Sequence, residues 1–190
     1  MSDEYGLEIV TAPTVEPVST EDAREWCRVA HNADDLTLDS LVTAARVLLE
    51  REFSRQICTA TWRLTLPYFP CWTLRVPLGP VASITSIQYV ATDGTTTTLS
   101  SSLYSVDTSR DPCVVTPAYG QVWPATRCQN RAVLVNFTAG YGGQADVPKP
   151  VRQAILFCVA NWYAERGDGT PTDIPQVART LMNAYWSGQL

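Results

Sequence analysis

The sequence predicts an α+β protein in which a small helical bundle, built from the N- and C-terminal segments, carries a central antiparallel β insertion. Apolar residues recur at helical spacing before residue 57 and again after residue 147. The residues between are rich in Thr, Ser, Val, Tyr and Trp and are broken by turn residues at short intervals, a pattern typical of strands. With 190 residues, the chain is long enough for one domain with a large insertion.

The first helix is expected to begin at Ser19, which suits an N-cap, with Asp22 placed three residues on to complete a capping box. Before it, prolines and the lack of periodicity indicate an extended arm. A Gly/Pro-rich break precedes a last helix. The expected parts are an N-terminal arm (1–18), a helical bundle (19–56 plus 148–166), a β insertion (57–143) and a C-terminal helix (172–187).

Within the insertion, Asp93-Gly94 is a strong hairpin signal, because both residues tolerate positive φ. The predicted strands around it form a small antiparallel sheet or barrel. In the bundle, we expect Leu41 and Leu48 to pack against Ile155 and Trp162.

Hydrophobic residues make up 45% of the chain and charged residues 17%, a low charge content for a monomer, so we expect partner subunits to cover part of the surface. Residues 1–57 carry 12 acidic and 5 basic side chains, whereas the remaining residues carry a net charge of +2. An acidic segment argues against direct binding to nucleic-acid phosphates. Among the basic residues only Lys149 is a lysine; a preference for Arg suits interface ion pairs, but a GC-rich genome would explain it equally well.

The six cysteines are scattered, no Cys-x-x-Cys pair occurs, and no signal peptide is recognisable, so we expect reduced thiols and synthesis in a cytoplasm. The single histidine cannot complete a zinc site at any usual spacing. We therefore expect no metal, no cofactor and no membrane association, since no apolar run approaches spanning length.

No catalytic pattern emerges. His31 lies at a helix end, and no G-x-S-x-G motif accompanies it. Acidic residues fall on helices beside Arg partners, as on a solvated helix face. The run Gly140-Tyr141-Gly142-Gly143 is not followed by the Lys of a phosphate-binding loop. We expect a protein that is not an enzyme; a small hydrolase would need a pocket around His31.

Aromatic residues are concentrated in the predicted β insertion and its loops. Most should form a small β core. Our functional hypothesis is that Tyr68, Phe69 and Trp123, which lie beside prolines in predicted loops, contact a neighbouring subunit.

The C-terminal helix presents an apolar stripe that ends in an aromatic residue. It either completes its own bundle or docks on a partner, and we favour docking because the Gly/Pro break separates it from the preceding helix. The residues expected at this interface are Ile174, Val177, Leu181, Tyr185 and Trp186.

Several short motifs, in this order and spacing, resemble the head–tail connector (adaptor) family of tailed bacteriophages and prophages. The similarity covers about residues 8–166. The motifs are Thr11-Ala12-Pro13, Glu16-Pro17-Val18-Ser19, Pro117-Ala118-Tyr119-Gly120 with Trp123-Pro124, Phe137-Thr138-Ala139-Gly140-Tyr141-Gly142, Val147-Pro148-Lys149-Pro150 and Val159-Ala160-Asn161-Trp162-Tyr163.

The resemblance implies a virion neck subunit that assembles with itself into a ring of about a dozen copies beneath the portal protein. Such a ring extends the DNA channel, and a stopper (head-closure) or tail protein docks below it. A net-negative lumen would let DNA pass without sequence-specific binding. The alternative is another tail or baseplate subunit whose β insertion binds a receptor or carbohydrate, through exposed aromatics in a concave site.

Because the cysteines are scattered, all six should be modified when the freshly purified protein is denatured and alkylated without reductant. Intact-mass measurement counts the adducts. Two or more protected pairs would contradict the reduced state.

Overall fold

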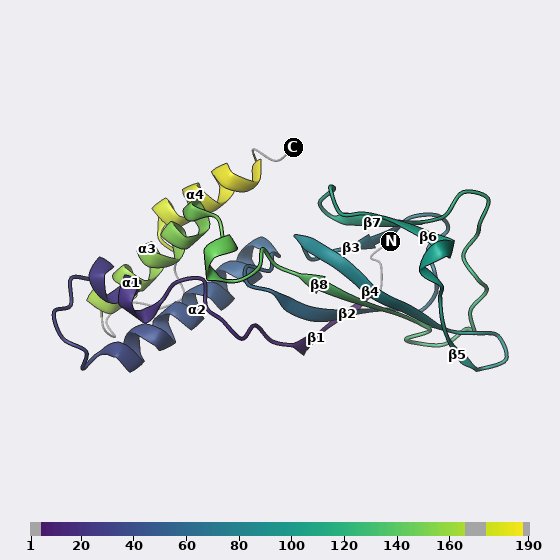
Figure 1. Ribbon diagram of the computed structural model, residues 1–190, viewed down its shortest axis with the longest axis horizontal. Coiled ribbons are helices and arrows are strands. Elements are labelled where there is room, and N and C mark those ends of the chain that lie inside the picture. The colour runs from purple at the N-terminus through teal and green to yellow at the C-terminus, as the bar shows by residue number, and fades with distance from the viewer. Residues whose placement is uncertain (1–4, 166–173, 188–190) are drawn as a thin grey trace. The chain divides into compact units, whose positions relative to one another are not determined.

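The computed structural model describes residues 5–165 and 174–187, and the chain forms two compact units, each built from two separate segments. The β unit contains residues 1–13 and 59–140, and the helical unit contains residues 14–58 and 141–190 (Figure 1). The predicted α+β class is confirmed, because the helices and the antiparallel strands segregate between the two units. Each unit is described by itself below.

The β unit consists of two antiparallel sheets. One sheet has five strands in the order β1-β2-β8-β4-β5, and the other has three in the order β3-β7-β6. The strands are β1 (Gly6–Thr11), β2 (Ala60–Leu66), β3 (Leu74–Val76), β4 (Val81–Val90), β5 (Thr96–Thr98), β6 (Tyr104–Asp107), β7 (Cys113–Pro117) and β8 (Val133–Ala139).

The N-terminal arm differs from the sequence prediction. Residues 6–11 form β1, an edge strand that pairs antiparallel with β2, so that Gly6 lies opposite Thr65. The arm therefore belongs to the β unit. Sequence periodicity missed this strand because its partner lies more than fifty residues away.

The hairpin between β4 and β5 forms at Asp93-Gly94, but with a different turn from the one expected. Of the two turn residues, Gly94 has positive φ (92°) and Asp93 does not. Asp93 instead accepts hydrogen bonds at Oδ1 from both the backbone N–H (2.9 Å) and the hydroxyl (2.7 Å) of Thr95. The aspartate thus closes the turn with its side chain, as Asx turns do.

Burial alternates along the central strand β8 with the period of two that a sheet requires: Val133, Val135, Phe137 and Ala139 are buried, and the residues between them are half-exposed. The buried face packs with apolar residues of the second sheet, including Val115, to form the core of the unit. The strands thus form two layers rather than the closed barrel that was an alternative.

The helical unit contains α1 (Thr20–Trp26), α2 (Asp35–Phe53), α3 (Lys149–Glu165) and α4 (Gln176–Ser187). Ser19 caps α1: its hydroxyl accepts from the Asp22 N–H (3.0 Å), and the Asp22 carboxylate accepts from the Ser19 N–H (3.4 Å). Asp22 also accepts from Arg152 on α3 (3.3 Å), so the cap joins two helices. None of the helices formed by the described residues is long and apolar enough to span a bilayer.

A buried ionic cluster centres on Arg46 of α2, whose side chain is 9% exposed. Its guanidinium donates to Glu16 (2.7 Å) and to Glu50 (2.8 Å). Glu50 also accepts from the side chain of Gln56 (2.7 Å) and from the backbone N–H of Ile57 (2.9 Å). Burial raises the pKa of the Glu50 carboxyl, while the Ile57 N–H and the Arg46 guanidinium act in the opposite direction.

The apolar face of α2 packs into the core of the helical unit. Leu38, Val42, Ala45 and Leu49 are fully buried, whereas Leu41 and Leu48 are partly buried and pack at the margin of the core. Phe53 at the end of the helix also packs there.

Replacing Leu49 with Ala should therefore destabilise the protein by about 2–5 kcal/mol, because it leaves a cavity in a packed core. Replacing Leu48 with Ala is the matched control, and it should cost less than about 2 kcal/mol because water reaches that site. Urea unfolding of both variants measures the difference, and equal losses would contradict the assigned helix face.

Candidate functional site

The structure brings together no catalytic constellation among the residues it describes. His31 is exposed in the turn before α2. No group of three or more His, Cys, Asp or Glu in the described ranges is placed to hold a metal ion. The acidic residues on α1 and α2 take part in structural contacts, such as the Arg24–Asp35 ion pair (2.6 Å).

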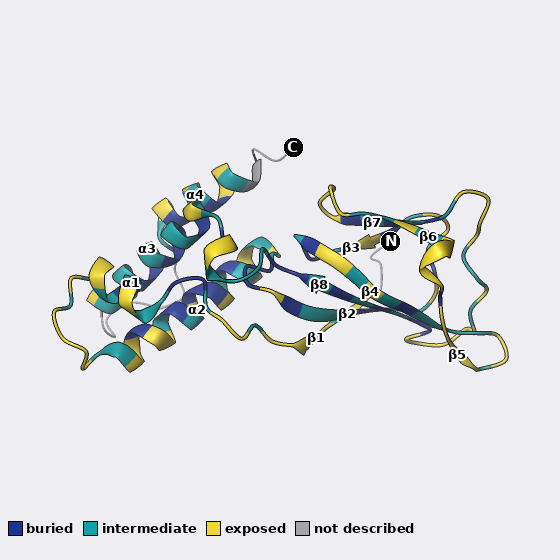
Figure 2. Cartoon of the chain, viewed as in Figure 1, coloured by how far each residue is buried: buried dark blue, intermediate teal, exposed yellow. Residues whose placement is uncertain are grey.

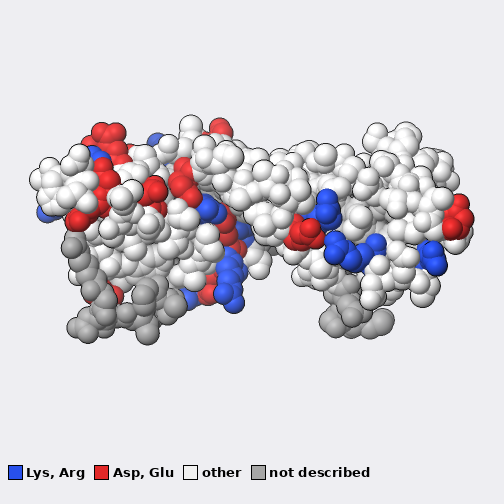
Figure 3. Space-filling view, turned by 90° about the horizontal axis from the view of Figure 1, so that it is seen from below, with Lys and Arg blue, Asp and Glu red and all other residues white. Residues whose placement is uncertain are grey.

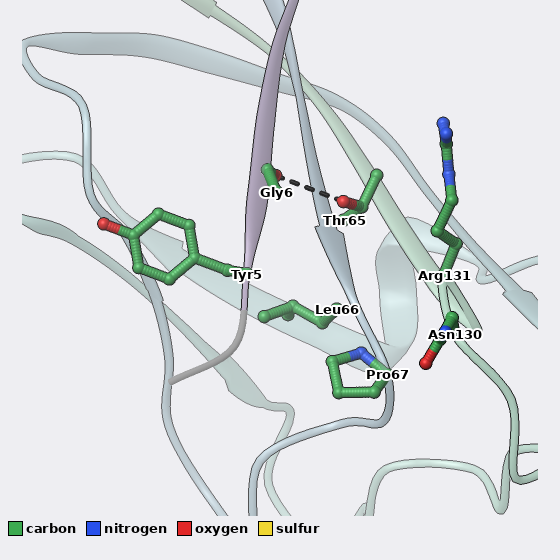
Figure 4. Close-up of a pocket in the computed structure, with 7 residues that line it drawn as sticks. All are labelled: Tyr5, Gly6, Thr65, Leu66, Pro67, Asn130 and Arg131. Carbon is green, nitrogen blue, oxygen red and sulfur yellow. Dashed lines mark hydrogen bonds between the residues drawn. The ribbon is translucent and has the colours of Figure 1, made fainter. Parts of the chain in front are cut away.

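A hollow of about 210 Å³ lies at the edge of the β unit (Figure 4). It is lined by Tyr5, Gly6, Thr65, Leu66, Pro67, Asn130 and Arg131. The Thr65 hydroxyl donates to the Gly6 carbonyl oxygen (3.2 Å), and Arg131 donates to Glu8 (3.2 Å), so both side chains are held by β1. The lining contains no carboxylate or histidine, the side chains that most often act as general acids and bases.

The acidic character of the chain resides in the helical unit. Its two segments carry 13 acidic and 9 basic residues, against 6 and 5 for the β unit. Figure 3 shows acidic and basic side chains gathered over the helical unit, whereas the β unit is mostly uncharged on the face in view. Part of the acidity is neutralised internally, as in the contacts of Asp22 with Arg152 and of Glu52 with Arg179.

The three loop aromatics expected at a subunit contact do not share one environment. Tyr68 is 66% exposed, but Phe69 is buried and Trp123 is half-buried. The Phe69 and Trp123 rings stack in parallel with centroids 4.8 Å apart, and Trp123 Nε1 donates to the Trp72 carbonyl oxygen (2.9 Å). Phe69 and Trp123 therefore hold the loops together, and only Tyr68 is presented to solvent.

Further exposed residues, not expected from the sequence, accompany Tyr68 on the same two loops. Trp72 is 59% exposed, Val122 is 81% exposed and Tyr119 is fully exposed. A turn closed by the hydrogen bond from Gln121 N–H to the Ala118 carbonyl (2.9 Å) presents Tyr119. We call Tyr68, Trp72, Tyr119 and Val122 the aromatic loop surface. The sequence could place these residues in Pro-rich loops, but it could not predict which of them are exposed.

The apolar stripe of the C-terminal helix faces its own unit in the described structure. Ile174, Ala178 and Met182 are buried in the core, and Leu181 and Tyr185 pack against it. Val177 is 52% exposed. The side chain of Trp186 and the expected helix start at residue 172 lie outside the described residues. In the subunit by itself, Ile174, Leu181 and Tyr185 therefore pack on their own unit, and a portal contact through this helix stays a prediction.

All six cysteines are free in the structure. Burial raises the pKa of the Cys58 and Cys158 thiols to about 12 and that of Cys113 to about 11, and it also raises the pKa of Cys27. Cys71 and Cys128 are exposed on the β unit. The buried thiols thus act as small apolar side chains.

The fold is shared with proteins of gene transfer agent particles. The chain matches a structure of the neck of an empty particle, computed with C6 symmetry, with a TM-score of 0.78, 24% identity and coverage of 95% of this chain and 94% of that chain. It matches the virion of the native particle with a TM-score of 0.77, 24% identity and coverage of 94% of each chain. A neck of the native particle, computed with C12 symmetry, matches with a TM-score of 0.66, 22% identity and coverage of 93% and 94%.

No protein-family model matches the sequence, and no curated protein is significantly similar to it. The structural match nevertheless extends over nearly the whole of both chains, so it includes both units. The fold is therefore that of a component of gene transfer agent particles whose necks have been determined with cyclic symmetry.

Because α4 completes the core of the helical unit, deleting residues 172–190 should lower the melting temperature by more than about 10 °C or leave the protein insoluble. Deleting residues 188–190 alone is the control. Calorimetry of both truncated proteins provides the measurement, and a nearly unchanged melting temperature for the longer deletion would show that α4 is dispensable for folding.

Proposed function

We propose that the chain is a structural subunit of a virion neck, a head–tail adaptor that forms a ring beneath the portal protein. The match over 95% of the chain to a component of a gene transfer agent neck supports this proposal most directly. The C6 and C12 symmetries of the matched necks agree with a closed ring of identical subunits. In this position the ring would extend the DNA channel and provide the docking surface for a stopper or tail protein.

The electrostatics of the chain suit this role. The helical unit carries a net charge of −4 and the β unit a net charge of −1. Duplex DNA carries about one negative charge per 1.7 Å of axis, so a net-negative subunit would not hold passing DNA by its phosphates. DNA would slide through such a ring without sequence-specific contacts.

The alternative, a tail or baseplate subunit that binds a receptor or carbohydrate, requires exposed aromatics in a concave site with polar partners. The hollow in the β unit contains one aromatic residue, Tyr5. The aromatic side chains of the aromatic loop surface are not part of its lining. This separation favours a protein-contact role for the loop aromatics.

The ring is tested with purified full-length protein, alone and mixed with purified portal. Native mass spectrometry and electron microscopy should show a closed ring of about a dozen copies, at least when portal is present as a template. Antibodies against the chain should label the neck of intact particles. A protein that stays monomeric with portal and is absent from particles would contradict the proposal.

We place the portal contact on the outward face of α4, where Val177 is 52% exposed. A charge buried in an apolar contact is costly, so Val177→Asp should weaken binding to portal rings by at least about tenfold while leaving the melting temperature nearly unchanged. Val47→Asp on α2 is the matched control, because Val47 is 50% exposed in the same unit. Titration by biolayer interferometry compares the variants, and equal affinities would place the portal contact elsewhere.

A further inference from the structure

The aromatic loop surface lies at one end of the β unit. The loop that follows β2 leaves from Leu66, which pairs with Val133 at the start of β8. The loop that precedes β8 returns beside Val90, whose carbonyl accepts from the Arg127 N–H (3.0 Å). At the opposite end, Ala60 pairs with Ala139, next to the points where the chain passes to the helical segments. The surface is therefore at the end of the unit farthest along its strands from those connections.

This surface carries no charge and is held rigidly. Residues 67–73 and 118–126 contain no Asp, Glu, Lys or Arg. The Phe69–Trp123 stack and the hydrogen bond from Trp123 to Trp72 tie the two loops together before any partner binds. Rigid, exposed aromatic side chains are the residues that dominate binding energy at interfaces, because little entropy is lost when they are covered.

A second apolar surface occurs on the same unit. The strand β1 forms one edge of the five-stranded sheet, and among the described residues no strand pairs with its outer side. Ile9 and Val10 on this strand are each 46% exposed, as the exposed colour of β1 in Figure 2 also shows. Its charged residue Glu8 is neutralised by Arg63 (3.5 Å) and Arg131 (3.2 Å).

The two edge strands of this sheet differ in length and in the side chains that they expose. β5, at the other side, is short and consists of three exposed threonines. β1 has six residues, contains no Pro or Lys and exposes branched apolar side chains. Edge strands of the second kind are unusual on monomers because they invite pairing with other chains.

We infer that the aromatic loop surface of one copy packs against the β1 edge of the next copy of this chain. Two different surfaces in contact make a head-to-tail interface, which forms a ring of more than two copies when the rotation between neighbours closes, whereas a surface that binds itself closes at two. The aromatic loop surface carries no charge, and Glu8 of the β1 edge is already paired with Arg63 and Arg131, so neither surface leaves an unpaired charge when it is covered. This inference rests on the proposed ring and names the residues that join its subunits.

The size of the surface also fits a repeated contact. The three exposed aromatic side chains present roughly 400–500 Å² of apolar area, about half of what one partner contributes to a stable interface of standard size. Such a contact is too small to hold an isolated dimer. In a closed ring each copy makes it twice, and closure makes the last contact intramolecular.

Cysteine pairs test the contact directly. In a Cys71→Ser, Cys128→Ser background, which removes the two exposed thiols, the double variant Ile9→Cys, Tyr119→Cys should form a disulfide-linked ladder up to the full ring under mild oxidation. The control pair Thr97→Cys, Tyr119→Cys uses the β5 edge and should give no ladder. Tyr119→Cys alone should stay monomeric on non-reducing gels; a disulfide-linked dimer would overturn the inference in favour of a contact between two aromatic loop surfaces.

A second measurement follows assembly itself. Trp72→Ala with Tyr119→Ala should raise the concentration needed for half-maximal ring formation at least about tenfold, with unchanged melting temperature. Leu36→Ala, which removes an 85% exposed apolar side chain from the helical unit, is the control. If the unmodified chain forms no ring even with portal, the proposed function fails. If rings form and the variants assemble normally, or the cysteine pair gives no ladder, the inference alone fails.

Discussion

The helical unit depends on a single buried guanidinium. Arg46 holds Glu16, on the segment that brings the chain in from β1, and Glu50, which in turn holds Gln56 and Ile57 on the segment that leads out to β2. One side chain of α2 thus fixes both connecting segments. The arrangement is stable only as a complete set, because a buried carboxylate that loses its partner keeps the whole cost of its desolvation. These contacts hold both connecting segments against α2, and they depend on tertiary packing rather than on helix propensity.

Local signals in the sequence predicted the local structure well. The capping box at Ser19 and Asp22 and the turn at Asp93-Gly94 both form, since each depends on residues within a few positions of one another. β1 could not be predicted in the same way. Its pairing of Gly6 with Thr65 is long-range, and in this edge strand only Leu7 packs against the core, so the apolar residues give little sign of a buried face.

The candidate surfaces show a finer limit of sequence reasoning. Neighbouring aromatic residues in one loop have opposite roles: Phe69 is buried in the stack, whereas Tyr68 is exposed. On α4, Ala178 and Met182 are buried in the core, whereas Val177, an equally apolar residue of the same helix, is exposed. Size and hydropathy identify such residues as candidates, but which of them is free to bind depends on packing against distant segments.

The interleaving of the two units has a consequence for biosynthesis. Neither unit is a continuous stretch of chain, because β1 precedes the α1–α2 segment and its partner β2 follows that segment. The five-stranded sheet is complete once β8 has been made, whereas the helical core still lacks α3 and α4. During translation, the apolar face of α2 therefore lacks its helical partners until about a hundred further residues have been made. The helical unit therefore completes its core later than the five-stranded sheet of the β unit, because the apolar side chains of α3 and α4 are its last contributions.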